Sequence, residues 1–341
     1  MGLSRRAALA AGTGAAAALV AGGTASAAPA ASSAAGQDDL AKLPPNEKIR
    51  RVYGRQKAKA GGTWYSHVTR VGASGAFETV VEDDADHVVN GYSVQKLAVA
   101  TAVMDKVDRG QLQLGQKLDL QADIILGGSG IYFLHTVWGD DITVANFLTA
   151  MLLVSDNTAV RMCGRVVPAL EINDILAAKG FVHTRVEPVA NPNRFFLGTT
   201  TPHEITNLLT RLAGGTLLSP SSCTFLLGIL RWINGYHDGI RRNMSSEERS
   251  RIATKYGADF NTLGAARHEA GIMFGADGAP ALVYGFFAEG LADLDNYGAT
   301  HPAVEAHSVL GRTLFDSIAT TTAPGARLKT VVPKFQPNHG G

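Results

Sequence analysis

The sequence predicts a mixed α/β fold. We expect an antiparallel sheet flanked by helices and built from both ends of the chain, with an all-helical subdomain inserted between its two parts. Short runs rich in β-branched and aromatic residues lie near the start of the mature chain and again near its end, and the residues between them repeat apolar side chains at helical spacing. The predicted α/β subdomain comprises 46–88 and 238–330, and the helical subdomain comprises 89–237, with a functional site between them.

The first elements of the mature chain are a helix and a hairpin. Asn46 is a suitable N-cap for a helix that ends at Ala60. The segments 63–71 and 76–81 are rich in β-formers and are separated by a Gly/Ser turn, which predicts a β-hairpin. The acidic run 82–86 is interpreted as a solvated turn.

The middle of the chain is predicted to be helical, and its end to contain strands and one helix. Apolar periodicity predicts helices at 92–107, 143–154, 158–167, 171–179, 202–213 and 220–232. Strands are predicted at 251–254, 271–274 and 281–288, followed by a closing helix at 303–319. The Gly-rich segment 127–130 lacks the lysine and the strand–helix context of a phosphate-binding loop, so it is interpreted as a turn.

Residues 1–28 are predicted to be an export signal. Arg5 and Arg6 precede an alanine-rich apolar run, which small residues follow. Adjacent arginines before a mildly apolar stretch are typical of twin-arginine signals, and an ordinary secretory signal or an uncleaved anchor is the alternative. The polar, Pro/Ala-rich segment 29–45 is predicted to be a linker. We expect a secreted protein with no membrane attachment once the signal is removed.

The composition is that of an ordinary soluble globular protein. Of the 341 residues, 45% are hydrophobic and 18% are charged. Removal of Arg5 and Arg6 from the 31 basic residues leaves 29 against 30 acidic ones, so the mature chain has a formal charge of −1. This balance gives no support for nucleic-acid binding. No metal-ligand spacing is found, so no metal is expected. Cys163 and Cys223 are able to pair in an oxidising compartment, or to serve as small buried side chains.

The segment Ser93-Val94-Gln95-Lys96 begins the first central helix. Residues three apart share one helix face, so the Lys96 amine can reach the Ser93 hydroxyl. The helix N-terminus favours a developing oxyanion, and a desolvated lysine has a lowered pKa and can accept the serine proton. Alone, this pattern is more typical of an N-cap serine and a surface lysine.

Three further segments contribute polar groups that suit a cleft. Ser155-Asp156-Asn157 follows the apolar helix 143–154 and can place a hydroxyl and an amide there. Lys255-Tyr256-Gly257 ends a predicted strand and can place an ammonium there, with the glycine allowing close approach of the backbone. The irregular segment 185–191 (RVEPVAN) precedes TTTP at 199–202 and supplies a carboxylate and an amide that can hold a water. Each segment alone is a plain turn, strand end or loop.

The order of these motifs resembles that of the class A serine β-lactamases and, more distantly, that of penicillin-binding proteins. The motifs are, in chain order, S-x-x-K, S-D-N, R-x-E-P-x-x-N with T-T-T-P, and K-x-G. The segments GSGIYFLHTVWGDDITVANFLTAMLLVSDNTAV and GAARHEAGIMF are similar to flanking segments of that superfamily, and the resemblance covers about residues 46–320. It implies a serine hydrolase that opens β-lactam amides through an acyl-enzyme without a cofactor. Its partner would be a small-molecule β-lactam or a related acyl substrate, and we expect a monomer.

The resemblance also implies catalytic roles. Ser93 would be the nucleophile, Lys96 would help to activate it, and Ser155 would pass a proton to the leaving nitrogen. Glu187 would activate the deacylating water. Lys255 would support Ser155 and contact the substrate carboxylate.

Substrate-binding roles follow from the same resemblance. Asn157 would hold the side-chain amide of the substrate, and Asn191 would help to position the deacylating water. The backbone N–H groups of Ser93 and Ala258 would form the oxyanion hole, beside Tyr256 and Gly257 on the same strand. Either Arg241 or Arg267 would supply a guanidinium for the substrate carboxylate. Asp156 would be structural.

Two positions depart from the family pattern. Tyr256 stands where the family has Thr or Ser, whose hydroxyl also contacts the substrate carboxylate. Gly198 stands where the family has an aspartate that pairs with the arginine of R-x-E-P, so Arg185 would lack its partner and the loop that carries Glu187 would be looser. Deacylation should suffer more than acylation. A penicillin-binding-protein-like D,D-peptidase or amidase, and a covalent β-lactam binder with slow turnover, are therefore alternatives.

Overall fold

The computed structural model describes residues 40, 42–134 and 139–318, so the predicted export signal and most of the predicted linker lie outside the described residues. One compact unit begins at Leu43. No helix within the described ranges has the length and apolar character that a membrane span requires.

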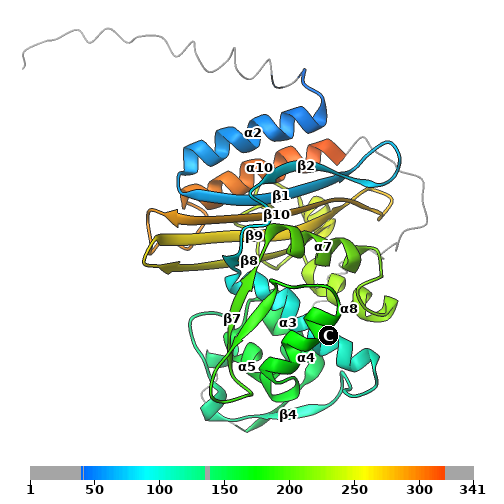
Figure 1. The fold of residues 1–341 in the computed structure, drawn as a ribbon, viewed down its shortest axis with the longest axis vertical. Coiled ribbons are helices and arrows are strands. Elements are labelled where there is room, and N and C mark those ends of the chain that lie inside the picture. The colour runs from blue at the N-terminus through cyan, green and yellow to red at the C-terminus, as the bar shows by residue number, and fades with distance from the viewer. Residues whose placement is uncertain (1–39, 41, 135–138, 319–341) are drawn as a thin grey trace, which may run out of the picture. The chain divides into compact units, whose positions relative to one another are not determined.

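A five-stranded antiparallel sheet with the strand order β2-β1-β10-β9-β8 forms the centre of this unit (Figure 1). The N-terminal part of the chain supplies β1 (Thr63–Val71) and β2 (Phe77–Asp83), and the C-terminal part supplies β8 (Ile252–Asn261), β9 (Gly264–Phe274) and β10 (Pro280–Leu291). The two parts join where β1 pairs with β10. The prediction of one antiparallel sheet built from both chain ends is confirmed.

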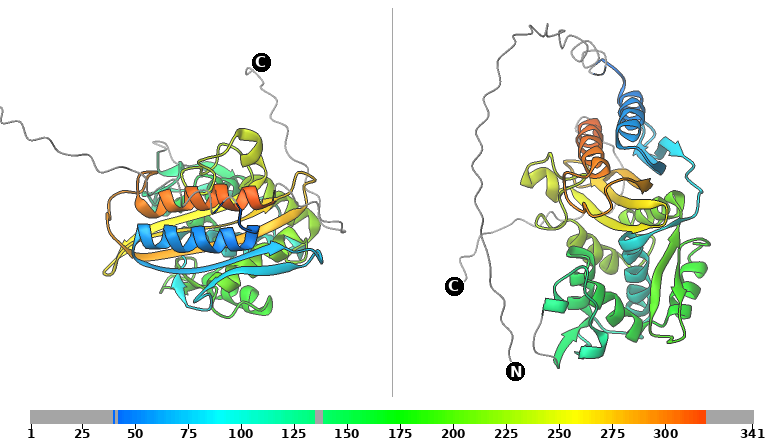
Figure 2. Two further views of the ribbon diagram at one scale, coloured as in Figure 1. Left: turned by 90° about the horizontal axis from the view of Figure 1, so that it is seen from above. Right: turned by 90° about the vertical axis from the view of Figure 1, so that its left-hand side faces the viewer.

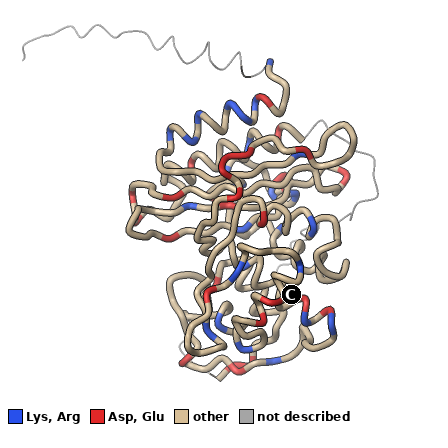
Figure 3. Tube along the Cα trace, in the orientation of Figure 1, with Lys and Arg blue, Asp and Glu red and all other residues tan. Residues whose placement is uncertain are grey.

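Two helices lie side by side on one face of the sheet, α2 (Pro45–Ala60) and α10 (Pro302–Ile318) (Figure 2). Basic residues recur along α2 (Figure 3), and one of them, Lys57, forms an ion pair of 2.5 Å with Asp83 at the end of β2. This ion pair fastens the first helix of the unit to the edge of the sheet. The predicted closing helix extends to residue 319, which lies outside the described residues.

The helices between the two halves of the sheet are α3 (Lys96–Asp108), α4 (Val144–Leu153), α5 (Asn157–Val166), α6 (Ala169–Ala178), α7 (Pro202–Ala213), α8 (Pro220–Leu230) and the short α9 (Ser246–Ser250). Except for α9, which has no apolar side chain, these helices share one core with residues of β8, β9 and β10. All residues of α3 from Lys96 to Asp105 are buried, because neighbouring helices surround it. Lys96 therefore enters the protein interior.

Small sheets and short helices complete the insert. β3 (Val89–Asn90), β7 (Phe195–Thr200) and β6 (Arg185–Pro188) form a three-stranded sheet, and β4 (Lys117–Leu120) pairs with β5 (Asp140–Thr143). The 3₁₀ turns are η1 (Tyr92–Gln95), η2 (Ala122–Ile124) and η3 (Tyr132–Leu134). Of the segment 185–191 that was predicted to be irregular, residues 185–188 form β6, which pairs with β7 as a hairpin. The prediction was wrong for these four residues, because so short a strand acquires its stability from pairing and not from a strong local pattern.

The first central helix begins later than predicted. Ser93 lies in η1, and α3 starts at Lys96. β8 and β9 are each several residues longer than the predicted strands, because they pair with each other along their whole length. Cys163 and Cys223 are both buried and unpaired.

Candidate active site

Two lysines from distant parts of the chain meet at one serine. Lys96 Nζ, at the start of α3, lies 3.0 Å from Ser155 Oγ, and Lys255 Nζ, on β8, lies 2.9 Å from the same oxygen. Lys96 also donates to Ser155 O at 2.6 Å and to Asn157 Oδ1 at 2.8 Å. Three of the segments singled out in the sequence therefore converge, as the family resemblance implies.

Ser155 occupies a strained connection between α4 and α5. Its φ is 57°, in the left-handed region that non-glycine residues rarely adopt. The next residue, Asp156, stabilises this connection, because its buried carboxylate accepts hydrogen bonds from the backbone N–H groups of Ala159, Ile131 and Tyr132 at 2.6–2.8 Å. Asp156 is thus placed as a structural residue, in agreement with the implied role.

The Ser93 turn packs directly against β8. A Cβ atom at Gly257 would lie 2.9 Å from Val94 N and 3.0 Å from Ser93 N, so only glycine allows this approach without a shift. The contact brings the Ser93 N–H beside the strand that carries Ala258, where the predicted oxyanion hole requires it. Ser93 is half-buried, and its hydroxyl makes no hydrogen bond within the described ranges.

Burial sets the charge state of the two lysines. Removal of the Lys96 ammonium from water lowers its pKa to about 7, although the nearby Asp156 charge acts in the opposite direction. Burial, together with the charge of Lys96, also holds the pKa of Lys255 well below its usual value. Burial therefore favours the neutral amine in this pair. A neutral amine beside Ser155 can exchange a proton with its hydroxyl, whereas the contact expected between Lys96 and the Ser93 hydroxyl is not among the hydrogen bonds of the described residues.

Glu187 and Asn191 are not part of this cluster. β6 buries Val186, and successive strand residues face opposite sides, so Glu187 is exposed. Its carboxylate forms no hydrogen bond or ion pair within the ranges that the structure covers. Asn191 is also exposed, and its Oδ1 accepts a hydrogen bond from Asn193 N at 3.0 Å. The structure thus leaves the predicted deacylation pair outside the hydrogen-bonded site.

The base of the β6–β7 hairpin is held by a residue that sequence reasoning missed. Gln95 is buried, and its Nε2 lies 2.6, 3.1 and 3.2 Å from the carbonyl oxygens of Thr199, Leu197 and Arg185. Arg185 has no ion pair among the described residues, as expected from Gly198. Gln95 links both strands of the hairpin at the point where the arginine–aspartate pair is missing. A polar residue within the apolar S-x-x-K segment was the available signal.

Gly198 is required at its position, and its substitution should destabilise the fold. Its φ is +74°, and a Cβ atom would lie 2.1 Å from Arg185 O. We expect Gly198→Ala to lower the free energy of unfolding by about 1–3 kcal/mol through the left-handed backbone alone, with a further loss from the clash. Gly180→Ala is the matched control, since Gly180 has a φ of +89° and no heavy atom within 4 Å of the new Cβ. Equal losses for both variants in chemical denaturation would contradict this explanation.

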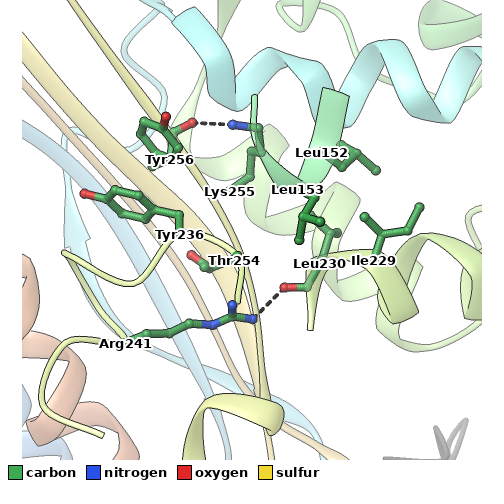
Figure 4. A pocket seen from close by; sticks show the side chains of 10 residues that line it. Leu152, Leu153, Ile229, Leu230, Tyr236, Arg241, Thr254, Lys255 and Tyr256 are labelled. Atoms are coloured by element: carbon green, nitrogen blue, oxygen red, sulfur yellow. Dashed lines mark hydrogen bonds between the residues drawn. The ribbon is translucent and has the colours of Figure 1, made fainter. Parts of the chain in front are cut away.

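Of the two arginines suggested for the substrate carboxylate, Arg241 borders the pocket that Lys255 and Tyr256 also line (Figure 4), whereas Arg267 is not among the residues that line it. Arg241 and Arg267 are both buried. Arg241 donates to the carbonyl oxygens of Leu230, Trp232 and Ile252. Arg267 donates to those of Ala266, Asp259, Leu294 and Asn296. These bonds hold loops together, and the buried Arg241 Nε is left without a hydrogen-bond partner among the described residues.

Tyr256 places its ring inside the site. Lys255 Nζ lies 4.5 Å from the ring centroid of Tyr256 and donates to Tyr256 O at 2.8 Å (Figure 4). On its other side the ring stacks on Tyr236, with centroids 3.9 Å apart and planes at 20°. No motif points to Tyr236, because only the folded chain brings it beside β8. Within 42–134 and 139–318, no three His, Cys, Asp or Glu side chains lie close enough together to hold a metal ion.

The antiparallel sheet, the helical insert and the cluster of two lysines at one serine agree with the serine β-lactamase superfamily. A sequence profile described as the β-lactamase enzyme family matches residues 44–318. The chain therefore belongs to the β-lactamase enzyme family. No curated protein has significant sequence similarity to it.

Several solved structures share the fold. A β-lactamase from Xanthomonas campestris has a TM-score of 0.66 at 20% identity, covering 81% of this chain and 100% of its own. A β-lactamase from Sphaerobacter thermophilus has a TM-score of 0.64 at 21% identity, covering 79% and 95%. A point mutant of PBP-A, solved as an acyl-enzyme complex with penicillin G, has a TM-score of 0.63 at 19% identity, covering 81% and 97%. At these identities the likeness shows a common fold alone.

Proposed function

We propose that this protein is a secreted serine hydrolase of the β-lactamase type, in which Ser93 attacks the β-lactam amide and becomes acylated. The observation that carries this proposal is the buried cluster in which Lys96 and Lys255 both contact Ser155, next to the Ser93 turn. Secretion is proposed from the predicted export signal, with its paired arginines.

The proposed acylation combines three proton transfers with the exchange of one bond. Ser93 Oγ forms a bond to the carbonyl carbon and gives its proton to the neutral amine of Lys96. The carbon–nitrogen bond of the ring then breaks, and the nitrogen takes a proton from Ser155, whose hydroxyl is resupplied by the lysine pair. The N–H groups of Ser93 and Ala258 stabilise the negative charge that develops on the carbonyl oxygen.

Release of the acyl group requires a base that activates a water molecule. A general base must lie within hydrogen-bond reach of its water, directly or through one water. Glu187 is exposed on β6, and Lys96 directs its hydrogen bonds to Ser155 and Asn157 instead. This arrangement favours the second candidate function, a covalent β-lactam binder with slow turnover. Intact-mass spectrometry of the mature protein mixed with penicillin G should show a persistent adduct, and a rapid return to the free mass would contradict slow release.

Substitution of the exposed glutamate tests the release step directly. We expect Glu187→Gln to change the rate of acyl-enzyme hydrolysis by less than about tenfold, against the 10²–10⁴-fold that a working general base contributes. The measurement is the decay of the adduct mass after removal of free penicillin. Glu78→Gln, at an exposed carboxylate on β2, is the matched control. A hundredfold longer adduct lifetime in Glu187→Gln alone would show that Glu187 is the deacylating base.

A further inference from the structure

A buried glutamate lies behind the strand that carries Lys255, and the proposed acylation gives it no part. Glu269, on β9, is fully buried. Lys255 pairs with Ala270 in the β8–β9 ladder and shares its face of the sheet, so Glu269, one residue earlier, faces the opposite side. On that side Glu269 Oε2 lies 3.7 Å from Nδ1 of His307, on α10. A carboxylate is costly to bury, so its partners indicate what it does.

The carboxylate of Glu269 holds two segments that border the site. Its Oε1 accepts a hydrogen bond from Thr254 Oγ1 at 2.8 Å, and Thr254 directly precedes Lys255 on β8. Its Oε2 accepts one from Ile240 N at 3.0 Å, and Ile240 directly precedes Arg241. Thr254, Lys255 and Arg241 all border the same pocket (Figure 4). One buried side chain thus fixes the backbone next to both cations.

The surroundings of Glu269 fix its carboxylate closely. A Cβ atom at Gly239 would lie 2.0 Å from Glu269 Oε2, so the loop before Ile240 packs directly on this oxygen. Tyr284 OH donates to Thr254 Oγ1 at 2.8 Å. Since Thr254 accepts this bond, its own proton is available for Glu269 Oε1. The carboxylate therefore has one defined position behind β8.

Glu269 is also a negative charge that acts on the lysine pair. Its charge opposes the loss of the Lys255 proton, whereas burial and the Lys96 charge promote it. On Lys96 the corresponding charges are those of Asp156 and Cys163. Burial raises the pKa of Glu269 to about 7. The carboxylate and the lysines therefore titrate in overlapping ranges and influence one another.

The other titratable groups around Glu269 come from three further parts of the chain. They are Tyr236 and Arg241 in the loop before α9, Tyr284 on β10 and His307 on α10. Burial lowers the pKa of His307 to about 3, so this ring is neutral near pH 7. The cations that act on the Glu269 carboxylate are thus Arg241 and Lys255.

We propose that Glu269 is a positioning residue for the acylation of Ser93: it holds the segments that carry Lys255 and Arg241, and its negative charge favours the protonated form of the lysine pair. This inference rests on the proposed function. In that mechanism the lysine pair returns a proton to Ser155 after the ring nitrogen has taken one, and a counter-charge behind β8 supports this step.

Glu269→Gln removes the charge and keeps the size of the side chain. Its amide oxygen can still accept from Ile240 N, and its NH₂ group can donate to Thr254 Oγ1, whose own proton can turn to Ala270 O at 3.5 Å. Without the negative charge, the lysine pair should lose its proton at a lower pH, by about one pH unit.

NMR of protein labelled with ¹³C at lysine Cε measures the midpoint of this titration. Lys96→Met and Lys255→Met identify the two signals. An unchanged or higher midpoint in Glu269→Gln would overturn the proposal.

The pH profile of acylation should move in the same direction. The ratio of the acylation rate with penicillin G at about pH 5.5 to the plateau rate should rise in Glu269→Gln by up to about tenfold, the factor that one pH unit represents. Both rates are measured by stopped flow on one sample, so their ratio does not depend on the folded fraction. General damage to the site would not raise it. A ratio equal to that of the parent would contradict the role of the charge.

Two further variants separate charge from packing. Tyr284→Phe removes the hydroxyl that donates to Thr254 and changes no charge, so it should keep the parent midpoint. Glu269→Asp keeps the charge, so its midpoint should stay closer to that of the parent than the midpoint of Glu269→Gln does. An equal shift in Tyr284→Phe would attribute the effect to disturbed packing and overturn the proposal.

The coupling between two charges is reciprocal, which provides a test that leaves Glu269 in place. Lys255→Met removes an ammonium from the opposite face of the sheet and none of the hydrogen bonds of Glu269. The carboxylate of Glu269 should then take up its proton at a higher pH than in the parent. NMR of protein labelled with ¹³C at glutamate Cδ measures this midpoint. Its failure to rise would contradict the coupling even if Glu269→Gln does not fold.

The NMR titrations need no substrate, so they distinguish failure of this inference from failure of the proposed function. Absence of labelling by penicillin G together with the expected midpoint shifts would refute the acylation of Ser93 while confirming the coupling. Normal labelling with unshifted midpoints would refute the role of Glu269 alone.

Discussion

Ser93→Ala is expected to abolish covalent labelling by a β-lactam while leaving the fold and its stability nearly unchanged. The variant removes the only oxygen that the proposed mechanism acylates. It should not weaken the structure, because the Ser93 hydroxyl makes no hydrogen bond within the described ranges and the side chain is half-buried. Intact-mass spectrometry measures the label, and thermal unfolding measures the stability.

Ser74→Ala, in the exposed turn between β1 and β2, is the matched control and should label like the parent. A label that persisted in Ser93→Ala would place the nucleophile elsewhere. Ser155 would then be the first alternative, because its hydroxyl contacts both lysines.

Lys96→Met is expected to slow acylation by about 10²–10⁴-fold, the contribution of a positioned general base. Methionine fills a similar buried volume but cannot accept a proton. In the parent protein the acylation rate should rise with pH and level off above pH 7, because burial lowers the pKa of Lys96 to about 7 and only the neutral amine can act as the base. Below that pH the amine is protonated and the rate falls. The midpoint belongs to the coupled Lys96–Lys255 pair and not to one residue.

Stopped-flow acylation measured across pH checks both the rate and the midpoint. Lys106→Met is the matched control, since Lys106 lies on the same helix but forms its ion pair with Glu171. It should keep the parent rate and profile. A parent-like rate in Lys96→Met, or the same midpoint near pH 7, would assign the base to another group.

The serines, lysines and asparagine of the site could be predicted, because they belong to motifs whose order along the chain is typical of the family. Ser155, Asn157 and Lys255 are far apart in the chain from Lys96, yet the structure brings all of them together. The arginines were not predictable, because a guanidinium can bind a substrate or a backbone carbonyl equally well. Which of these it does depends on the loops that surround it, and for Arg267 those loops supply a carbonyl for every N–H group.

Gln95 shows a second kind of limit. Its position between Ser93 and Lys96 gives it no evident role, because its three acceptors lie about 90 to 104 residues away in the chain. Judged by the family pattern alone, Gly198 predicts a looser loop, because the aspartate that would pair with Arg185 is missing. In the folded protein a different residue closes the same neck, so a lost interaction at one position does not imply a looser loop.

The sequence by itself determined the family, the antiparallel sheet shared by both chain ends, and the identity of the lysines and serines of the site. These features follow from local periodicity and from motif order, both of which are properties of the chain. Only the tertiary structure decided that Glu187 faces solvent, that both arginines bind carbonyl groups, and that Tyr236 covers Tyr256. The exposure and the partners of a side chain depend on residues that are remote in the chain, so they are settled only when the elements pack.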